Sequence, residues 1–452
     1  MIPKHTQDTS RLGFHYYPDT FHYTRKDLQN WSPILKRLGA SWLVLIAPVD
    51  RAIPEAFLLG VIEAGIQPIL HFHLPLDNSI DLPGLQLLFE NYADWGVKFV
   101  VLFDRPNTRQ AWPAQSWVQS DLAERFLDIF LPPAELAYQA GLIPVLPPLE
   151  PGGDYWDTAF LQAVLNGLGR RSQSDLLGSL TLSAYAYVED KPLDWGAGGP
   201  ERWPKSRPYY LPAGHQDQRG FYIFDWYLAQ AQAVLARTLP IILLGAGSRL
   251  KAANSPDQAD INKLEHAERN LALAERLAAA AGENLPHKPD EPISSHVLAC
   301  NFWLLTAATG SPQLKDAWFL PDGSSLPVVS ALSEWSTGGI PCADQSPTSP
   351  PVMPAPEPAR QSLQGIDHYL LLPMFDWGVS EWYLDAIRPF VIKHHPTVGF
   401  SPSEAAGANR VTVVGGEQLF AEQILEELRN AGCRVDRITG DGTEIASILA
   451  TQ

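Results

Sequence analysis

Strand-like runs alternate with helix-like segments through the first two thirds of this chain, and no other feature constrains its fold as strongly. Each run is short and mostly apolar, and the fourth is a continuous apolar run of the kind typical of a strand that is buried on both faces. The eight runs lie at residues 13–17, 42–47, 67–71, 98–103, 143–147, 180–187, 240–244 and 297–304. Eight strands that alternate with helices predict an α/β fold, namely a closed (β/α)8 TIM barrel.

The segments between these runs carry apolar residues at helical spacing. The clearest helical patterns lie at residues 27–38, 121–138, 221–239 and 257–280, and residues 326–332 predict the last helix of the barrel. No glycine-rich dinucleotide fingerprint follows any of the strands, so the barrel has no competing interpretation as a Rossmann fold.

The chain continues well beyond the barrel, because 452 residues exceed what a single hydrophobic core supports. Residues 341–364 are rich in proline and serine and have no apolar period, which predicts an extended linker. We therefore predict the (β/α)8 barrel at 1–340 and a small doubly wound α/β module at 365–452. In this module we expect strands at 369–375, 411–414 and 434–438, and helices at 417–431 and 443–450.

The tail carries two glycine-punctuated strand ends, Val411-Thr412-Val413-Val414-Gly415-Gly416 and Arg437-Ile438-Thr439-Gly440. Together with Ala431-Gly432 between them, this pattern resembles the type 2 cell wall binding repeat, a bacterial module. The resemblance covers about forty residues and implies that a cell-wall polysaccharide is a partner of the tail.

The fourth run ends in Asp104-Arg105-Pro106, at the barrel end where catalytic groups gather. This segment resembles the fourth strand of the clan A glycoside hydrolases, which ends in Asn-Glu-Pro with the Glu as general acid/base. In the seventh run, Gly245 stands where that clan carries its nucleophilic Glu. Because clan enzymes need both carboxylates, the resemblance implies a barrel that has lost its catalytic pair.

Other carboxylates follow the strands and are candidates for a relocated mechanism. They are Asp104 after the fourth strand, Glu150 after the fifth and Glu189 after the sixth. In an extended strand, Asp104 and Arg105 would point to opposite faces. Arg105 and Arg249 either bind an anionic ligand or form structural ion pairs.

A sugar-binding face is predicted from polar and aromatic side chains at or beyond the strand ends, because aromatic rings stack on the C–H faces of sugars. The candidates are His15, Tyr17, His71, His73, Asp104, Arg105, Asn107, Tyr155, Trp156, Tyr185, Tyr187, Asn301, Trp303 and Trp318. Long connections at 150–157 and 188–220 predict a deep, aromatic-lined groove. The histidines lack the spacing of a metal site, so we expect no metal and no cofactor.

The net charge of −17 argues against nucleic acid as a partner. The three cysteines are too far apart in the chain to predict a disulfide framework. Neither a signal peptide nor a membrane-spanning run is visible, which predicts a cytoplasmic protein, or one at the cell envelope or outside the cell if a leader was missed.

Three hypotheses follow from the sequence. The first is a carbohydrate-binding, glycoside-hydrolase-like protein that is catalytically degenerate and recognises a glycan or cell-wall polysaccharide. The second is an active glycosidase that uses Asp104, Glu150 or Glu189. The third is a protein-interaction scaffold at the cell envelope. The sequence assigns no catalytic residue firmly, so enzymatic activity is left open.

Overall fold

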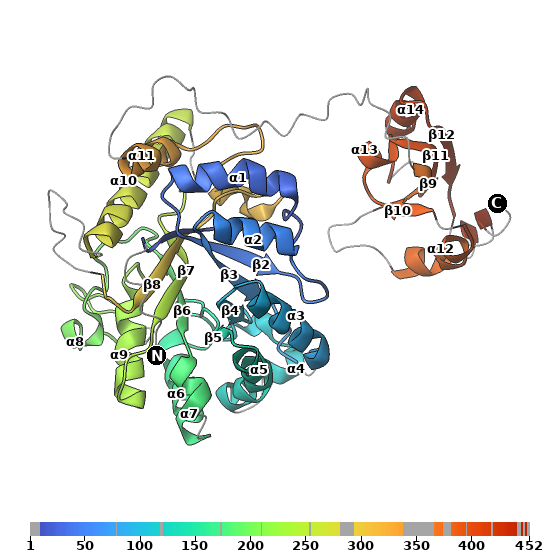
Figure 1. Ribbon diagram of the computed structural model, residues 1–452. Helices are drawn as coiled ribbons and strands as arrows, with labels where there is room; N and C mark the ends of the chain where they lie inside the picture. The colour runs from blue at the N-terminus through green and yellow to red at the C-terminus, as the bar shows by residue number, and fades with distance from the viewer. Residues whose placement is uncertain are drawn as a thin grey trace. The chain divides into compact units, whose positions relative to one another are not determined.

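The computed structural model describes residues 10–77, 79–117, 121–171, 174–208, 210–252, 255–280, 293–337, 366–373, 381–394, 396–416, 419–440, 444–445 and 448–449. The chain forms two compact units, Met1–Val352 and Met353–Gln452, each of which is described by itself (Figure 1). The predicted linker at 341–364 lies outside the described residues and stays a prediction.

Eight parallel strands form the sheet of the first unit. They are β1 (Leu12–His15), β2 (Trp42–Ala47), β3 (Gln67–Phe72), β4 (Phe99–Leu102), β5 (Ile143–Val145), β6 (Leu182–Tyr187), β7 (Ile241–Gly247) and β8 (Val297–Phe302). Their order in the sheet is β5-β4-β3-β2-β1-β8-β7-β6. Beside β6, Thr181 pairs with β5: the Leu146 N–H donates to the Thr181 carbonyl at 2.9 Å and the Thr181 N–H to the Pro144 carbonyl at 3.2 Å. These contacts close the sheet, and the predicted TIM barrel is confirmed.

Helices follow the strands and surround them in Figure 1. The longer ones are α1 (Arg25–Arg37), α2 (Glu55–Glu63), α3 (Leu82–Asp94), α5 (Leu122–Gln139), α6 (Asp157–Arg170), α9 (Ile223–Leu235), α10 (Pro256–Ala280) and α11 (Pro327–Ser336). The shorter ones are α4 (Ala114–Trp117), α7 (Ser174–Ser179) and α8 (Gly199–Arg202). The start of α1 shows why such segments are helical, since the Thr24 hydroxyl caps the Asp27 N–H at 3.2 Å while the Asp27 carboxylate accepts from the Thr24 N–H.

Side-chain alternation along the strands produces two cores. On β2, Trp42 and Val44 point into the barrel, while Leu43 and Leu45 pack against the helices outside it. The inner core is dense, and the Trp42 and Phe99 rings lie 5.7 Å apart within it. The barrel is therefore filled by side chains, and only its ends can present a site.

The second unit contains four parallel strands in the order β10-β9-β11-β12. These are β9 (Ile366–Leu371), β10 (Thr397–Gly399), β11 (Ala408–Val414) and β12 (Arg434–Ile438), with helices α12 (Glu381–His394), α13 (Pro402–Ala405) and α14 (Glu422–Asn430) between them. Leu370 on β9 packs with Phe390 of α12, whereas its neighbour Leu371 packs in the core that holds Leu425 of α14. The helices thus cover both faces of the sheet, and the predicted doubly wound module is confirmed. Part of the predicted helix at 443–450 lies outside the described residues.

Candidate functional site

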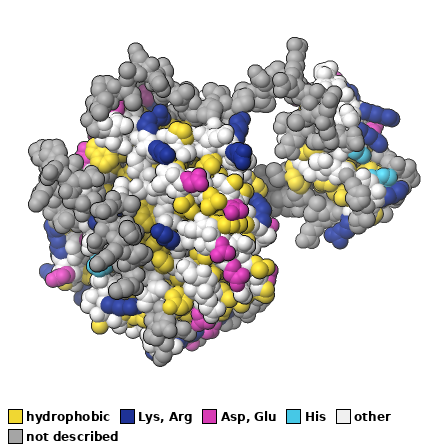
Figure 2. Space-filling view, viewed as in Figure 1, with side chains coloured by type: hydrophobic (Ala, Val, Ile, Leu, Met, Phe, Trp, Pro, Cys, Tyr) yellow, Lys and Arg dark blue, Asp and Glu magenta, His cyan; other side chains and the backbone are white. Residues whose placement is uncertain are grey.

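The inward-facing positions continue past the carboxyl ends of the strands and converge at one end of the barrel. We call this group the barrel mouth, and it consists of His15, His71, His73, Asp104, Arg105, Glu150, Tyr185, Tyr187, Glu189, Arg249 and Trp303. Figure 2 shows acidic and basic side chains interspersed with apolar ones over the described surface of the first unit that is in view.

The backbone leaves the β conformation at the end of β4. Phe103 has a φ of 69° and Arg105 a φ of 43°. The Phe103 ring consequently points outward, with its centroid 6.0 Å from that of Phe126 on α5. Asp104 then turns inward, where its Oδ1 accepts a hydrogen bond of 2.7 Å from the Tyr185 hydroxyl. The alternation expected for an extended strand is therefore wrong here, because both Asp104 and Arg105 contact Tyr185.

Arg105 is the centre of the polar contacts in the barrel mouth. Its Nη1 lies 3.2 Å from Oδ2 of Asp104, and its Nε lies 2.8 Å from Oε2 of Glu150. The guanidinium carbon lies 4.3 Å from the centre of the Tyr185 ring. Burial opposes the charge, but the Tyr185 hydroxyl and the two carboxylates raise the pKa of Arg105, so the guanidinium is permanently cationic. Of the two interpretations from the sequence, these contacts favour structural ion pairs.

Asn107 holds the loop that carries Glu150. Its Nδ2 donates to the carbonyls of Glu150 at 2.8 Å and Tyr155 at 3.0 Å, and its Oδ1 accepts from the Glu150 N–H at 2.9 Å. The side chain is 0% exposed. The amide of Asn107 is thus fully used within the protein, and we leave it out of the proposed ligand contacts.

Tyr185 and Tyr187 lie side by side on β6 with nearly parallel rings, 5.7 Å apart at 10°. The Arg249 guanidinium lies 4.5 Å from the Tyr187 ring and forms an ion pair with Glu189. Burial raises the pKa of both tyrosines, so their hydroxyls are neutral donors at physiological pH.

Gly245 on β7 faces these two rings. A Cβ at this position would lie 2.6 Å from the Tyr187 hydroxyl oxygen and 3.1 Å from Cδ1 of Tyr185. The space into which a side chain at 245 would project is thus already filled by Tyr187.

Buried histidines add uncharged acceptors to the barrel mouth. His71 Nε2 lies 2.8 Å from the Phe103 carbonyl oxygen and must carry the proton, because a carbonyl only accepts. Its Nδ1 is then a bare acceptor, and no group in the described part of the chain pairs with it. Burial lowers the pKa of His71 to about 3 and that of His15 well below its ordinary value, so both rings are neutral. The His15 ring lies 4.5 Å from Trp303, and that of His71 lies 4.4 Å from the exposed His73.

Four other residues predicted to bind the ligand lie inside the protein. Trp318 is 0% exposed and packs edge-on against Phe14 at 5.3 Å, and Asn301, also 0% exposed, donates to the Leu243 carbonyl at 2.9 Å. Trp156 is buried with the Arg219 guanidinium 5.4 Å from its ring, and the ring of Tyr17 stacks on His22 at 3.7 Å. We leave these side chains out of the proposed contacts. Tyr155, the remaining predicted residue, lines a separate cavity on the flank of the barrel.

Asp157 is a buried residue that sequence reasoning missed. Its carboxylate accepts hydrogen bonds from the Gly152 N–H at 2.9 Å, the Gln218 amide at 2.8 Å and the Tyr227 hydroxyl at 2.8 Å. It thereby ties the connection after β5 to α9. The sequence offers no signal for this role, because an acidic residue at a helix start usually only caps the helix.

Two further features concern ions and membranes. Within the described ranges, no set of three or more His, Cys, Asp or Glu residues is arranged to hold a metal ion. None of the helices described here has the length and apolar character needed to span a bilayer.

Comparison with known proteins identifies no family for this chain. No family model matches the sequence, and no curated protein matches it. Among solved structures, an endo-β-1,3-glucanase of family GH128 (subgroup II) from Sorangium cellulosum is 14% identical with a TM-score of 0.41, over 72% of this chain and 97% of that one. Xylanase 10B from Thermotoga maritima is 11% identical with a TM-score of 0.43, over 74% of this chain and 96% of that one. Similarity at this level says nothing about the substrate or activity of this chain.

Proposed function

We propose that the barrel mouth binds a carbohydrate without hydrolysing it. The observation that carries the proposal is the position of Arg105 against both Asp104 and Glu150. Hydrolysis of this type needs one carboxylic acid to protonate the leaving oxygen and a second carboxylate to attack or to activate water. In this barrel one oxygen of each carboxylate is paired with the same guanidinium, which ties both acids into one structural cluster.

The opposite side of the mouth supports the same proposal. Tyr187 fills the space in front of Gly245, and its raised pKa keeps the phenol protonated. A neutral phenol is a poor nucleophile, but it donates hydrogen bonds well. Glu189 does not substitute for the missing carboxylate, because it pairs with Arg249.

Binding of a sugar fits the groups that are left unpaired or accessible. His73 is exposed in the mouth, with its ring 4.4 Å from that of the buried His71, and an imidazole can exchange hydrogen bonds with a sugar hydroxyl. Trp303 is partly exposed beside His15 and offers a ring face of the kind that stacks on sugars. Three non-glycine residues of the mouth region, Phe103, Arg105 and Glu189, have positive φ, a strain that tends to concentrate at functional sites.

Binding and turnover are tested together on the full chain. A glycan array identifies the ligand, and isothermal titration then compares wild type with Trp303→Ala. The matched control is Trp335→Ala, a partly buried tryptophan at the far end of α11, remote from the mouth. We expect Trp303→Ala to weaken binding roughly tenfold, in line with the loss of one aromatic contact, and the control to leave it unchanged.

The same protein is incubated with the array ligand and with p-nitrophenyl glycosides, and release of reducing sugar is measured. Binding without turnover supports the proposal. Turnover that disappears in Glu150→Gln or Asp104→Asn would establish the active glycosidase instead. Failure to bind any glycan would leave the scaffold hypothesis as the better explanation of the barrel.

For the second unit, we propose attachment to a cell-wall polysaccharide. The support is the resemblance of residues 411–440 to the type 2 cell wall binding repeat. The test is co-sedimentation of the full chain with bacterial cell walls, compared with a chain that ends before residue 353. Equal sedimentation of both chains contradicts the proposal.

A further inference from the structure

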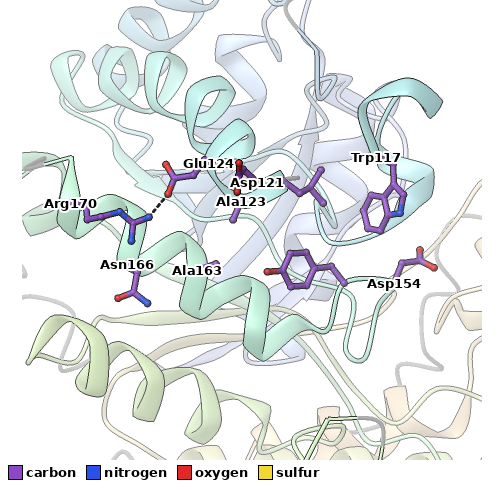
Figure 3. A pocket seen from close by; sticks show the side chains of 10 residues that line it. Trp117, Asp121, Ala123, Glu124, Asp154, Ala163, Asn166 and Arg170 are labelled. Carbon is purple, nitrogen blue, oxygen red and sulfur yellow. Dashed lines mark hydrogen bonds and ion pairs between the residues drawn. The ribbon is translucent and has the colours of Figure 1, made fainter. Parts of the chain in front are cut away.

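A cavity of about 540 Å³ lies on the flank of the barrel and is lined by none of the residues of the barrel mouth (Figure 3). Its walls come from the connection between β4 and α5, the connection between β5 and α6, and the facing surfaces of α5 and α6. A volume of this size lies within the range of roughly 300–1,000 Å³ that is usual for small-molecule sites. None of the functions considered so far uses this cavity.

One end of the cavity is aromatic and the other is polar. Trp117 and Asp154 lie at one end in Figure 3, and Asn166 and Arg170 lie at the other. Tyr155 also lines the cavity and, like Trp117, is only partly buried. The two rings can therefore present aromatic surface to a ligand.

The polar groups of the cavity differ in how far they are already used. Glu124 pairs with Arg170 and also, at 2.8 Å, with Arg171, so the polar end is neutralised internally. One oxygen of Asp154 accepts from the Arg109 N–H at 2.8 Å, which fixes the carboxylate in place. The Asn166 side chain is exposed and has no hydrogen-bond partner among the residues that the structure describes. The cavity thus offers aromatic surface with a positioned carboxylate at one end and a free amide at the polar end.

We propose that this cavity is a second carbohydrate-binding site, specific for a short neutral oligosaccharide. Aromatic faces beside hydroxyl acceptors are the combination that a sugar ring requires. The charged residues that line the cavity are three acids and one base, namely Asp121, Glu124, Asp154 and Arg170. The excess of negative charge repels an acidic sugar, so a neutral one is favoured. The site shares its ligand class with the proposed function of the mouth, but it is physically separate and is tested separately.

The two sites are joined through a single connection in the chain. Glu150 in the mouth and Tyr155 in the cavity are both bonded, through their backbone, to the Asn107 amide. The Asn107 amide thus holds together the segment that lines the cavity and the segment that positions Glu150 against Arg105. This link gives one protein two sites for the same class of glycan on adjoining parts of the surface.

The experiment is isothermal titration of the full chain with cellotetraose, laminaritetraose and xylotetraose. We expect at least one of these probes to bind at two sites per chain. Trp117→Ala should remove one site or weaken it roughly tenfold, by loss of an aromatic contact. Asn166→Ala, an exposed helix position where alanine cannot disturb folding, should weaken the same site. The matched control is Trp95→Ala, a partly buried tryptophan at the end of α3.

The outcomes separate this inference from the proposed function. If Trp117→Ala and Asn166→Ala both bind like wild type while Trp303→Ala loses a site, the cavity proposal is overturned and the mouth proposal stands. If Trp303→Ala binds like wild type while Trp117→Ala and Asn166→Ala weaken one site, the cavity proposal stands and the mouth proposal fails. If none of the three probes binds, the cavity proposal is overturned. Trigalacturonate serves as the acidic probe. If it binds to wild type and Trp117→Ala weakens that binding, the assignment of a neutral oligosaccharide to the cavity is overturned.

Discussion

Replacement of Asn107 by alanine tests whether one buried amide organises the candidate site. The amide makes three hydrogen bonds, of 2.8, 3.0 and 2.9 Å, all to backbone groups of Glu150 and Tyr155. Truncation leaves two carbonyls and one N–H without these partners. At about 1 kcal/mol for each hydrogen bond, the local loss is about 3 kcal/mol, which corresponds to roughly a hundredfold increase in the opening of this loop.

Hydrogen exchange at the Glu150 amide measures this opening directly. We expect exchange roughly a hundred times faster in Asn107→Ala than in wild type, together with weaker glycan binding at the barrel mouth. Asn107→Asp should be at least as damaging, because a carboxylate would face two carbonyl oxygens. The control is Asn91→Ala, since Asn91 is exposed on α3 and makes a single hydrogen bond of 2.7 Å to the Leu87 carbonyl.

The result that would refute this reasoning is specific. If folded Asn107→Ala protein protects the Glu150 amide as well as wild type does, the three hydrogen bonds do not hold the loop. A uniform increase in exchange over the whole barrel, equal at Glu150 and at β2, would show a global loss of stability in place of the local one.

Three further predictions concern the barrel. Gly245→Ala should cost about 1–3 kcal/mol in denaturant unfolding, because the new Cβ would lie 2.6 Å from the Tyr187 hydroxyl oxygen; Tyr187→Phe in the same chain should recover part of the loss, and additive effects would contradict the contact. Burial raises the pKa of Asp157 in the folded chain, so stability should fall as pH rises from the ordinary carboxyl range through the raised value. In Asp157→Asn the denaturant midpoint should change less with pH over this range. A midpoint that depends on pH as steeply as in wild type would contradict the assignment. Burial also raises the pKa of the Cys300 thiol, so iodoacetamide should leave Cys300 unmodified in native protein, as peptide mass spectrometry can check, and rapid labelling would contradict its burial.

Prediction from sequence succeeded for the barrel because the signal is repeated along the chain. Runs such as residues 42–47 are apolar on both faces, and only a strand covered on both sides tolerates this pattern in water. The tail was predictable for a similar reason. Apolar residues form a continuous run at Val411–Val414, whereas in the following helix they recur at helical spacing. Strand ends were predicted less well. The fourth strand was expected to reach residue 103, but β4 ends at Leu102 because Phe103 adopts a positive φ.

The candidate site was predicted only in part. Sequence reasoning placed Asp104, Arg105 and Tyr185 near one another, because the carboxyl ends of the barrel strands converge. It also placed Asn107 and Trp318 in the ligand set. The Asn107 amide, however, hydrogen-bonds to backbone groups, and the Trp318 ring is packed in the core. A position near a strand end does not reveal whether a side chain points to the mouth, the loop or the core.

The sequence alone determined the order of strands and helices and the two separate α/β patterns, and it placed Arg105 and Gly245 at the ends of the fourth and seventh strands. These follow from residue type and local period, which act over a few neighbours in the chain. Only the tertiary structure decided that Arg105 lies between Asp104 and Glu150, and that Tyr187 fills the space before Gly245. The contacts of Arg105 with Glu150 and of Gly245 with Tyr187 join residues more than forty positions apart, and their geometry depends on two backbone angles and on packing that no local pattern encodes.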